Sequence, residues 1–311
     1  MARRDRDPLE IVSLRQLRYF NAAMQSSSFV EAARTCSISQ PALSEQIALL
    51  EDALGTRLFE RVGRRASPTQ AALQLHLRMT ACMGDLQAAL RATGESSVDL
   101  SGRVRIGLVQ SYGACWVAPA VHSLQVQWPD LAVSLIRRTA SALIDGVARG
   151  DFDFVVTFDV QDREDLEIER CFKEPYVAIC PAPSRRPIRL KKLAGERLAL
   201  LPTEYAMRRQ IEQLFAAQGL RPNVHFESDS LEDLIDAVRT TGLTAVVNAA
   251  TALSLQVSGA TRIDEPTLVR TSCLVRARNR YHTRAALRLW DSLADMASEM
   301  QTKMRPFSSR S

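Results

Sequence analysis

Apolar residues recur at helical spacing over about the first ninety residues, whereas short continuous apolar runs follow beyond residue 102. Spacings of three and four residues place apolar side chains on one face of an α-helix, and short runs are typical of buried strands. The first two stripes are Leu14, Leu17, Phe20 and Met24, then Phe29, Ala32, Ala33 and Cys36. Because Ser26-Ser27-Ser28 separates them, the pattern predicts two short helices.

A third helix is predicted directly after a tight turn at residues 37–39. Ser39 is a good N-cap, Pro41 stands in the first turn where no intrahelical N–H is lost, and Gly55 ends the stripe. The stripe consists of Leu43, Ile47, Leu50 and Leu54. Two helices joined by a short turn, the second with a polar face at its start, predict a helix-turn-helix, although a small three-helix bundle has the same stripes.

The next segment predicts a basic hairpin and a long helix. Residues 58–66 indicate two short strands around a glycine-containing turn, either a wing that brings Arg64 or Arg65 near phosphates or a solvated loop. Thr69 is a suitable N-cap for the helix that follows. Its apolar residues form a heptad seam, Ala72, Leu75, Met79, Cys82, Leu86 and Ala89. The seam predicts a dimerisation helix, with packing on its own domain as the alternative.

Beyond residue 102 strand-like runs alternate with helical stretches. Residues 103–108, 131–136 and 152–156 predict strands, and residues 140–149 predict a helix between the last two. Such alternation predicts a parallel sheet with helices packed on it. The polar run Gly94-Glu95-Ser96-Ser97 has the composition of a hinge. The sequence therefore predicts an all-α N-terminal part followed by an α/β part.

Composition narrows the class of protein. The 311 residues are 46% hydrophobic and 24% charged, which is typical of a globular chain of about two domains and excludes a disordered or fibrous one. The net charge of +5 permits a nucleic-acid partner. The six cysteines form no C-x-x-C pair, no apolar run approaches membrane-spanning length, and the first residues lack a signal-peptide core. We therefore expect a cytoplasmic protein with reduced, buried thiols.

The N-terminal residues closely resemble those of the LysR-type transcriptional regulators. The matching runs are Leu14-Arg15-Gln16-Leu17-Arg18-Tyr19-Phe20, Ser28-Phe29-Val30-Glu31-Ala32-Ala33, Ser39-Gln40-Pro41-Ala42-Leu43-Ser44-Glu45-Gln46-Ile47, Leu49-Leu50-Glu51-Asp52-Ala53-Leu54-Gly55, and Leu58-Phe59-Glu60-Arg61 with Pro68-Thr69. The resemblance implies a winged helix-turn-helix DNA-binding domain at residues 1–69 and a linker and dimerisation helix at 70–94. It implies an effector-binding domain at 95–311, built of two α/β lobes as in periplasmic solute-binding proteins.

The resemblance also implies a DNA-binding surface. The family contacts DNA through the N-terminal face of its recognition helix, here Gln40, Pro41 and Ser44, and its wing arginine corresponds to Arg64. Where the family often has a basic residue, this chain has Glu45, whose carboxylate would repel phosphate but accept a hydrogen bond from a cytosine amino group. Weaker candidates for backbone contacts are Arg15, Arg18, Arg34 and Arg65.

In the effector domain the resemblance implies that the chain crosses between the lobes near residues 171–181 and 268–275, and that a last helix at 284–300 returns to the first lobe. Small ligands bind at the carboxyl ends of strands in such sheets. Ser111 at a helix N-terminus suits an anionic group, and Arg138 would pair with a carboxylate if it points inward. The residues expected in the cleft are Gln110, Ser111, Tyr112, Arg138, Thr139, Ser141, Pro202, Thr203, Glu204, Ser228, Ser230 and Asn248. For Ser111, Thr139, Thr203 and Ser230, ordinary helix capping is the alternative.

These features predict a bacterial sequence-specific DNA-binding transcriptional regulator controlled by a small-molecule effector. The expected partners are double-stranded operator or promoter DNA, an effector for which an anionic group is one option, and further copies of the chain in a homodimer or homotetramer. Contact with RNA polymerase is left open. The dimerisation residues are expected to be Leu75, Met79, Cys82 and Leu86. No cofactor, metal site or membrane contact is expected.

Two rival functions are weaker. An enzyme is disfavoured because the four histidines lie far apart and no nucleophile elbow, P-loop or dinucleotide motif occurs. A redox switch would use Cys171 and Cys180, because one subgroup of the family senses peroxide through a cysteine pair. That pair begins just after the strand corresponding to residues 198–201, where this chain has Thr203-Glu204-Tyr205-Ala206. We therefore interpret the two cysteines as buried thiols.

Overall fold

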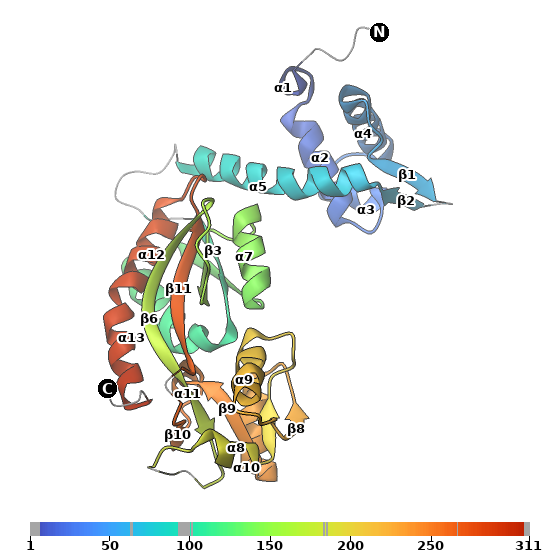
Figure 1. Cartoon of the computed structure of the whole chain (residues 1–311). Coiled ribbons are helices and arrows are strands. Elements are labelled where there is room, and N and C mark those ends of the chain that lie inside the picture. Colours follow the sequence, from blue (N-terminus) through green and yellow to red (C-terminus); the bar gives the residue numbers. More distant parts are fainter. Residues whose placement is uncertain are drawn as a thin grey trace. The chain divides into compact units, whose positions relative to one another are not determined.

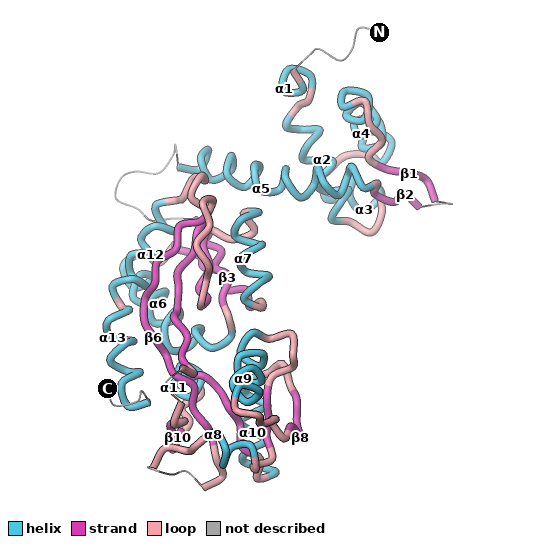
Figure 2. The backbone as a smooth tube through the Cα atoms, in the orientation of Figure 1, coloured by secondary structure: helices cyan, strands magenta, loops and turns pink. Residues whose placement is uncertain are grey.

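The computed structural model describes residues 7–62, 65–92, 100, 102–182, 184, 186–265 and 267–307. The chain divides into two compact units, Met1–Gln87 and Ala88–Ser311, and the boundary falls within a long helix. Figures 1 and 2 show the course of the chain through each unit. The predicted hinge at residues 94–97 lies outside the described residues. No helix in the described ranges is long and apolar enough to cross a membrane.

The N-terminal unit is a helical bundle with a two-stranded wing, as the sequence predicts. Its elements are α1 (Pro8–Ile11), α2 (Leu14–Gln25), α3 (Phe29–Thr35), α4 (Gln40–Leu54), β1 (Phe59–Val62), β2 (Arg65–Pro68) and α5 (Gln70–Ala92). Helices α2, α3 and α4 pack on one another around the buried side chains of Phe20, Leu43 and Leu50. Strands β1 and β2 pair antiparallel, with Phe59 opposite Pro68. The helix-turn-helix and the wing are therefore confirmed.

Local hydrogen bonds set where α4 begins and ends. The Ser39 hydroxyl accepts a hydrogen bond from the Ala42 amide at 3.3 Å, and Pro41 lies in the first turn. Gly55 ends the helix in the left-handed region at φ 63°, which costs glycine no Cβ clash. Both ends agree with the sequence prediction, because caps depend on contiguous residues.

A buried carboxylate joins α4 to the wing. Glu51 is 6% exposed, and its Oε1 accepts hydrogen bonds from the amides of Leu58 at 2.7 Å and Phe59 at 2.9 Å. Its Oε2 accepts a hydrogen bond from the Arg57 guanidinium at 2.9 Å. A buried charge is tolerated only when it is paired and hydrogen-bonded, as this one is. Glu51 therefore fixes the start of β1 against the last turns of α4.

Helix α5 begins at the predicted cap but buries only part of the predicted seam. The Thr69 hydroxyl accepts a hydrogen bond from the Ala72 amide at 3.2 Å. Met79 is buried in the core of the N-terminal unit and Leu75 packs against that core. Cys82 and Leu86 are exposed in the single chain. The unit's own core thus occupies the first half of the seam and leaves the second half open.

The second unit is built on one mixed sheet. Its strands are β3 (Gly102–Leu108), β4 (Leu131–Arg137), β5 (Phe154–Phe158), β6 (Leu166–Ile179), β7 (Leu198–Leu200), β8 (Val224–Glu227), β9 (Thr244–Asn248), β10 (Ala260–Arg262) and β11 (Val269–Ala277). The order is β4-β3-β5-β11-β6-β9-β7-β8, and β10 pairs with β6. β3 lies parallel to β4 and β5, and β7 lies parallel to β8 and β9. The expectation of a parallel sheet is wrong at the centre, where β6 and β11 run antiparallel to their neighbours.

The long strands β6 and β11 carry the chain between two lobes, at the two predicted crossings (Figure 1). The first lobe holds β3, β4 and β5, and the second holds β7, β8 and β9. The helices are η1 (Gln110–Tyr112), η2 (Gly113–Val117), α6 (Ala118–Gln127), α7 (Ala140–Arg149), α8 (Leu190–Ala194), α9 (Ala206–Ala217), α10 (Leu231–Thr241), α11 (Ala249–Ser254), α12 (Arg284–Asp295), α13 (Ala297–Met304) and η3 (Arg305–Phe307). The single last helix predicted from the sequence is interrupted at Met296 and forms α12 and α13.

Replacing Glu51 by alanine tests its tie between helix and wing. We expect Glu51→Ala to lower the free energy of unfolding of the N-terminal unit by about 2 kcal/mol, because two buried amides lose their acceptor. The change is measured by urea titration of the helical circular-dichroism signal. The tryptophans Trp116, Trp128 and Trp290 all lie in the second unit, so their fluorescence reports the unfolding of that unit separately.

Glu45→Ala is the matched control, because Glu45 is an exposed carboxylate on the same helix. We expect it to change the free energy of unfolding by less than about 0.5 kcal/mol. Equal stability of the Glu51 and Glu45 variants would contradict the role assigned to Glu51.

Candidate functional site

The start of α4 presents a polar surface. Gln40, Pro41 and Glu45 are exposed and Ser44 is half-buried. The Gln40 side-chain amide donates a hydrogen bond to the Ser44 hydroxyl at 3.0 Å, so these two side chains form one polar edge. Other predicted DNA-contacting residues that are exposed in the N-terminal unit are Arg15, Arg18 and Arg34. Gln40, Pro41, Glu45 and the three arginines are therefore accessible on this unit.

The basic tip of the wing is only partly described. The last described pair of the hairpin joins Val62 to Arg65. Arg64 lies outside the described residues, and only the backbone of Arg65 is described. Their contacts with DNA stay predictions.

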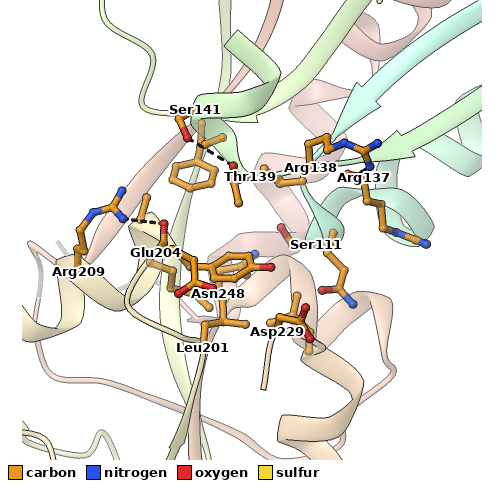
Figure 3. Close-up of a pocket in the computed structure, with 18 of the residues that line it drawn as sticks. Ser111, Arg137, Arg138, Thr139, Ser141, Leu201, Glu204, Arg209, Asp229 and Asn248 are labelled. Carbon is orange, nitrogen blue, oxygen red and sulfur yellow. Dashed lines mark hydrogen bonds between the residues drawn. The ribbon is translucent and has the colours of Figure 1, made fainter. Parts of the chain in front are cut away.

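A cavity of about 430 Å³ lies between the two lobes of the second unit. It is bordered by the segments that follow β3, β4, β7 and β8, at the carboxyl ends of these strands. Eight of the predicted cleft residues line it, namely Gln110, Ser111, Arg138, Thr139, Ser141, Glu204, Ser230 and Asn248. Figure 3 shows Ser111, Thr139 and Asn248 around this cavity. The reasoning from strand ends thus located the cavity.

Four predicted cleft residues do not line this cavity. Tyr112 is fully buried, and its hydroxyl donates a hydrogen bond to Glu174 at 2.5 Å. Thr203 is exposed, Pro202 is half-buried, and the Ser228 hydroxyl donates to Asp233 at 2.8 Å. Neighbours in sequence point in different directions at a strand end, so spacing alone does not separate lining residues from supporting ones.

One lining residue of the cavity, Arg270, belongs to a buried ion pair that joins the crossover strands. Arg270 on β11 lies directly opposite Glu174 on β6, and its Nε donates to Glu174 Oε1 at 2.5 Å. Both side chains are almost completely buried, at 3% and 0% exposure. Glu174 Oε2 accepts from the Asn248 side-chain amide at 2.8 Å and the Ala250 amide at 3.2 Å. With Tyr112 as a further donor, Glu174 therefore accepts four hydrogen bonds from residues of both lobes.

Arg270 is held by more than this pair. Its Nη2 donates to the Ser111 hydroxyl at 2.8 Å, and its guanidinium carbon lies 4.1 Å from the centre of the Phe158 ring. Burial lowers the pKa of Arg270, but the Glu174 carboxylate raises it and prevails, so the guanidinium stays charged. A charge-assisted, stacked arginine of this kind is rigid.

The remaining charges around the cavity are positive in balance. Apart from Arg270, the lining contains Arg137, Arg138, Arg209, Glu204 and Asp229. The guanidinium of Arg138 donates to the Arg137 carbonyl and that of Arg209 to the Glu204 carbonyl, each at 2.7 Å. Helices α7 and α9 begin at the cavity without a side-chain cap, so their free amides add partial positive charge.

One further hydrogen bond spans the cavity between the lobes. The Gln110 side-chain amide donates to Glu232 Oε2 at 2.5 Å, which links the end of β3 to the first turn of α10. Ser230 caps α10 by accepting a hydrogen bond from the Asp233 amide at 3.2 Å.

Sequence reasoning missed both members of the ion pair. Each is a single charged residue inside a predicted crossover strand, Glu174 close to Phe172 and Tyr176, and Arg270 next to Val269. The available signal was one charged residue within each apolar strand. Because a charged residue is seldom buried without a partner, two such residues in the two crossover strands indicate a buried ion pair.

Both units match known bacterial regulators. Residues 14–73 match the family described as "Bacterial regulatory helix-turn-helix protein, lysR family", and residues 98–298 match the "LysR substrate binding domain". The chain belongs to the LysR family. It is a LysR-type DNA-binding transcriptional regulator with an effector-binding domain, as the sequence predicts.

Relatives of this LysR-type regulator cover most of its length. It is 29% identical over 294 residues to the uncharacterised regulator YfeR of Shigella flexneri, covering 93% of this chain and 95% of the relative. It is 28% identical over 231 residues to OxyR of Escherichia coli, covering 73% and 76%. Full-length CbnR bound to its target DNA shares the fold with a TM-score of 0.68 at 18% identity, covering 92% of this chain and 100% of CbnR. A full-length OxyR variant from Pseudomonas aeruginosa has a TM-score of 0.69 at 20% identity, covering 96% and 99%.

Cys171 and Cys180 of this LysR-type regulator are half-buried, in environments that disfavour redox chemistry, whereas Cys82 is exposed. Burial, with the charge of Glu169, raises the pKa of Cys171 to about 12, and burial also raises the pKa of Cys180. Redox-active thiols instead have lowered pKa values, because the thiolate is the reactive form. Among the described residues, no group of three or more His, Cys, Asp or Glu side chains could hold a metal ion. The raised pKa values therefore favour unreactive thiols at Cys171 and Cys180 over a switch, but the expectation that the thiols are buried is wrong for the exposed Cys82.

Thiol labelling tests this interpretation. With a pKa of about 12, Cys171 is thiolate in only about one molecule in ten thousand at pH 8. We expect iodoacetamide to leave Cys171 and Cys180 unlabelled in the native chain at pH 8 and to label both in urea, as read by peptide mass spectrometry. Peroxide treatment is expected to leave both thiols intact, and loss of the two together would contradict the interpretation.

Proposed function

We propose that a small effector bound in the inter-lobe cavity controls how this LysR-type regulator binds operator DNA. The observation that carries the proposal is the cavity itself, because both lobes and the crossover strand β11 supply its lining. A ligand that contacts two lobes stabilises one lobe arrangement over others, and this difference in affinity is what can shift a conformational equilibrium. The proposal requires no catalytic step and places the protein in the bacterial cytoplasm, with its DNA.

At the DNA, α4 is proposed to read bases in the major groove. Gln40 and Ser44 present donors and acceptors on one edge, and a Gln side chain can pair with adenine. Glu45 would accept a hydrogen bond from a cytosine amino group and so bias the operator sequence. Contacts with the DNA backbone and minor groove are proposed for Arg18, Arg34, Arg64 and Arg65.

Pairing of two chains is proposed through the exposed end of the α5 seam. Leu75 and Met79 already contact the core of their own unit, whereas Cys82 and Leu86 are open. A dimer would present two α4 helices to successive major grooves, roughly 34 Å apart. A tetramer and a contact with RNA polymerase are extensions of the same proposal.

Salt titration of Arg64→Ala tests the wing. We expect weaker operator binding and a reduction of about one in the slope of log affinity against log salt, because one phosphate contact is lost. Binding is measured by fluorescence anisotropy with a labelled operator duplex obtained by selection from random sequences. The matched control is Arg288→Ala, which removes an exposed arginine of α12 in the second unit. An unchanged slope for Arg64→Ala would remove this residue from the interface.

Sedimentation of Leu86→Asp tests the seam. We expect this charge to lower the apparent mass in sedimentation velocity, because a desolvated carboxylate at a helix pair is unfavourable. Leu73→Asp is the control, because Leu73 is exposed on the same helix away from the seam. A profile for Leu86→Asp identical to that of the original chain would refute a dimer through this surface.

A further inference from the structure

The buried guanidinium of Arg270 has more hydrogen-bond donors than the protein satisfies. An arginine carries five N–H groups, and here Nε donates to Glu174 and one Nη2 hydrogen is directed to Ser111. The Tyr176 hydroxyl is a third hydrogen-bond partner of Arg270, so two of the five N–H groups remain without an acceptor within the described part of the chain. These N–H groups belong to a side chain that lines the cavity.

Glu174 cannot take up these remaining donors. Its two oxygens already accept four hydrogen bonds, from Tyr112, Asn248, Ala250 and Arg270. The Ser111 hydroxyl accepts from Arg270, and its own proton has no acceptor within the described ranges. Ser111 is 4% exposed and lines the cavity. The remaining guanidinium N–H groups of Arg270 and the hydroxyl proton of Ser111 are thus unpaired hydrogen-bond donors on two almost completely buried side chains.

The cavity lining also includes apolar side chains beside its polar ones. They are Val109, Phe158, Leu201, Met207 and Leu231. Phe158 stacks on the Arg270 guanidinium at 4.1 Å, so an apolar side chain lies directly beside this charged group. A ligand that fills this cavity needs one group of hydrogen-bond acceptors and an apolar body.

We propose that the effector is a small organic acid with a single carboxylate and an apolar or aromatic body, and that its carboxylate binds Arg270 and Ser111. This inference rests on the proposed function, because it concerns the ligand of the same cavity. It makes Arg270 the specificity-determining residue of the site. The apolar body lies against Phe158 and the neighbouring apolar side chains.

The geometry favours a single carboxylate over other anions. A planar guanidinium edge matches the two oxygens of a carboxylate, and such bonds are short and strong. A dianion such as phosphate would bring a second negative charge near Glu204 and Asp229, which also line the cavity. The uncapped starts of α7 and α9 compensate one further charge more easily than two.

Matched ligand pairs test the proposal on the full-length chain. The probes are benzoate, phenylacetate and isovalerate, each compared with its primary carboxamide, and inorganic phosphate. Tryptophan fluorescence follows the melting of the second unit, which contains all three tryptophans. We expect at least one carboxylate to raise the melting temperature by several degrees near 100 times its dissociation constant. We expect its carboxamide and phosphate to give no shift.

Variants then test the anchor. Arg270→Gln alone would leave Glu174 as a buried unpaired charge, so the double variant Glu174→Gln, Arg270→Gln removes both charges and keeps the polar shapes. We expect it to fold and to bind the carboxylate at least about tenfold more weakly, the value of a charged hydrogen bond. Ser111→Ala is expected to weaken binding to a smaller extent. Arg137→Gln, which removes an exposed lining charge, is expected to change the dissociation constant by at most about fivefold.

Different outcomes overturn different claims. If carboxamides bind as well as carboxylates, or if phosphate binds instead, the carboxylate assignment is wrong while an effector cavity stands. If the carboxylate binds the double variant with unchanged affinity, Arg270 is not the anchor. If no probe stabilises the original chain, the carboxylate class is overturned. A separate measurement tests the effector function itself. If variants that fill the cavity, such as Ala140→Trp, bind the operator with the same affinity as the original chain, the cavity does not control DNA binding.

Discussion

The buried pair of Glu174 and Arg270 is the constraint on which the second unit depends. Burying two charges costs several kcal/mol each, which their mutual attraction and further hydrogen bonds must offset. The partners come from both lobes, Ser111 and Tyr112 after β3, and Asn248 and Ala250 at the end of β9. The four donors to Glu174 can therefore come together only when both lobes meet at the crossing of β6 and β11. This requirement places the ion pair, and the cavity that Arg270 lines, where the lobes join, which is the position from which a ligand can influence both.

A related device sets the geometry of the N-terminal unit. Glu51 is also a buried carboxylate whose partners lie on another element, the amides of Leu58 and Phe59 at the start of the wing. It fixes the hairpin against α4, just as Ser39 and Gly55 fix the two ends of that helix. In both units a charge inside the protein determines the relation between two elements, while apolar packing supplies the bulk of the stability.

The parts of this structure that could be predicted from the sequence are those encoded by neighbouring residues. Helix α4 is local, because Ser39, Pro41 and Gly55 lie within or beside it. Strand ends are also visible in the sequence, and for that reason Ser111 and Asn248 were placed at the cavity. The role of Arg270 was not predictable in this way, because its partner Glu174 is 96 residues away and only the antiparallel register brings them together.

For helix α5 the sequence predicts the apolar stripe, but it does not indicate which neighbouring element or chain packs against that stripe. The seam at Leu75 and Met79 packs on its own unit, whereas Cys82 and Leu86 are exposed. One stripe therefore serves a core and, as we propose, an interface. The mixed sheet has a similar cause, because the long strands β6 and β11 must run in opposite directions to leave the first lobe and return to it.

Coupling between the cavity and the operator is the central claim, and one measurement tests it most directly. The affinity of the full-length chain for its operator is measured without ligand and with the saturating carboxylate that gives the largest thermal shift. The account predicts that the saturating carboxylate changes the operator affinity by about fivefold or more. By linkage, saturating DNA changes the affinity for the carboxylate by the same factor. Equal operator affinity in the two conditions would show that occupation of the cavity does not control DNA binding, and would contradict the account.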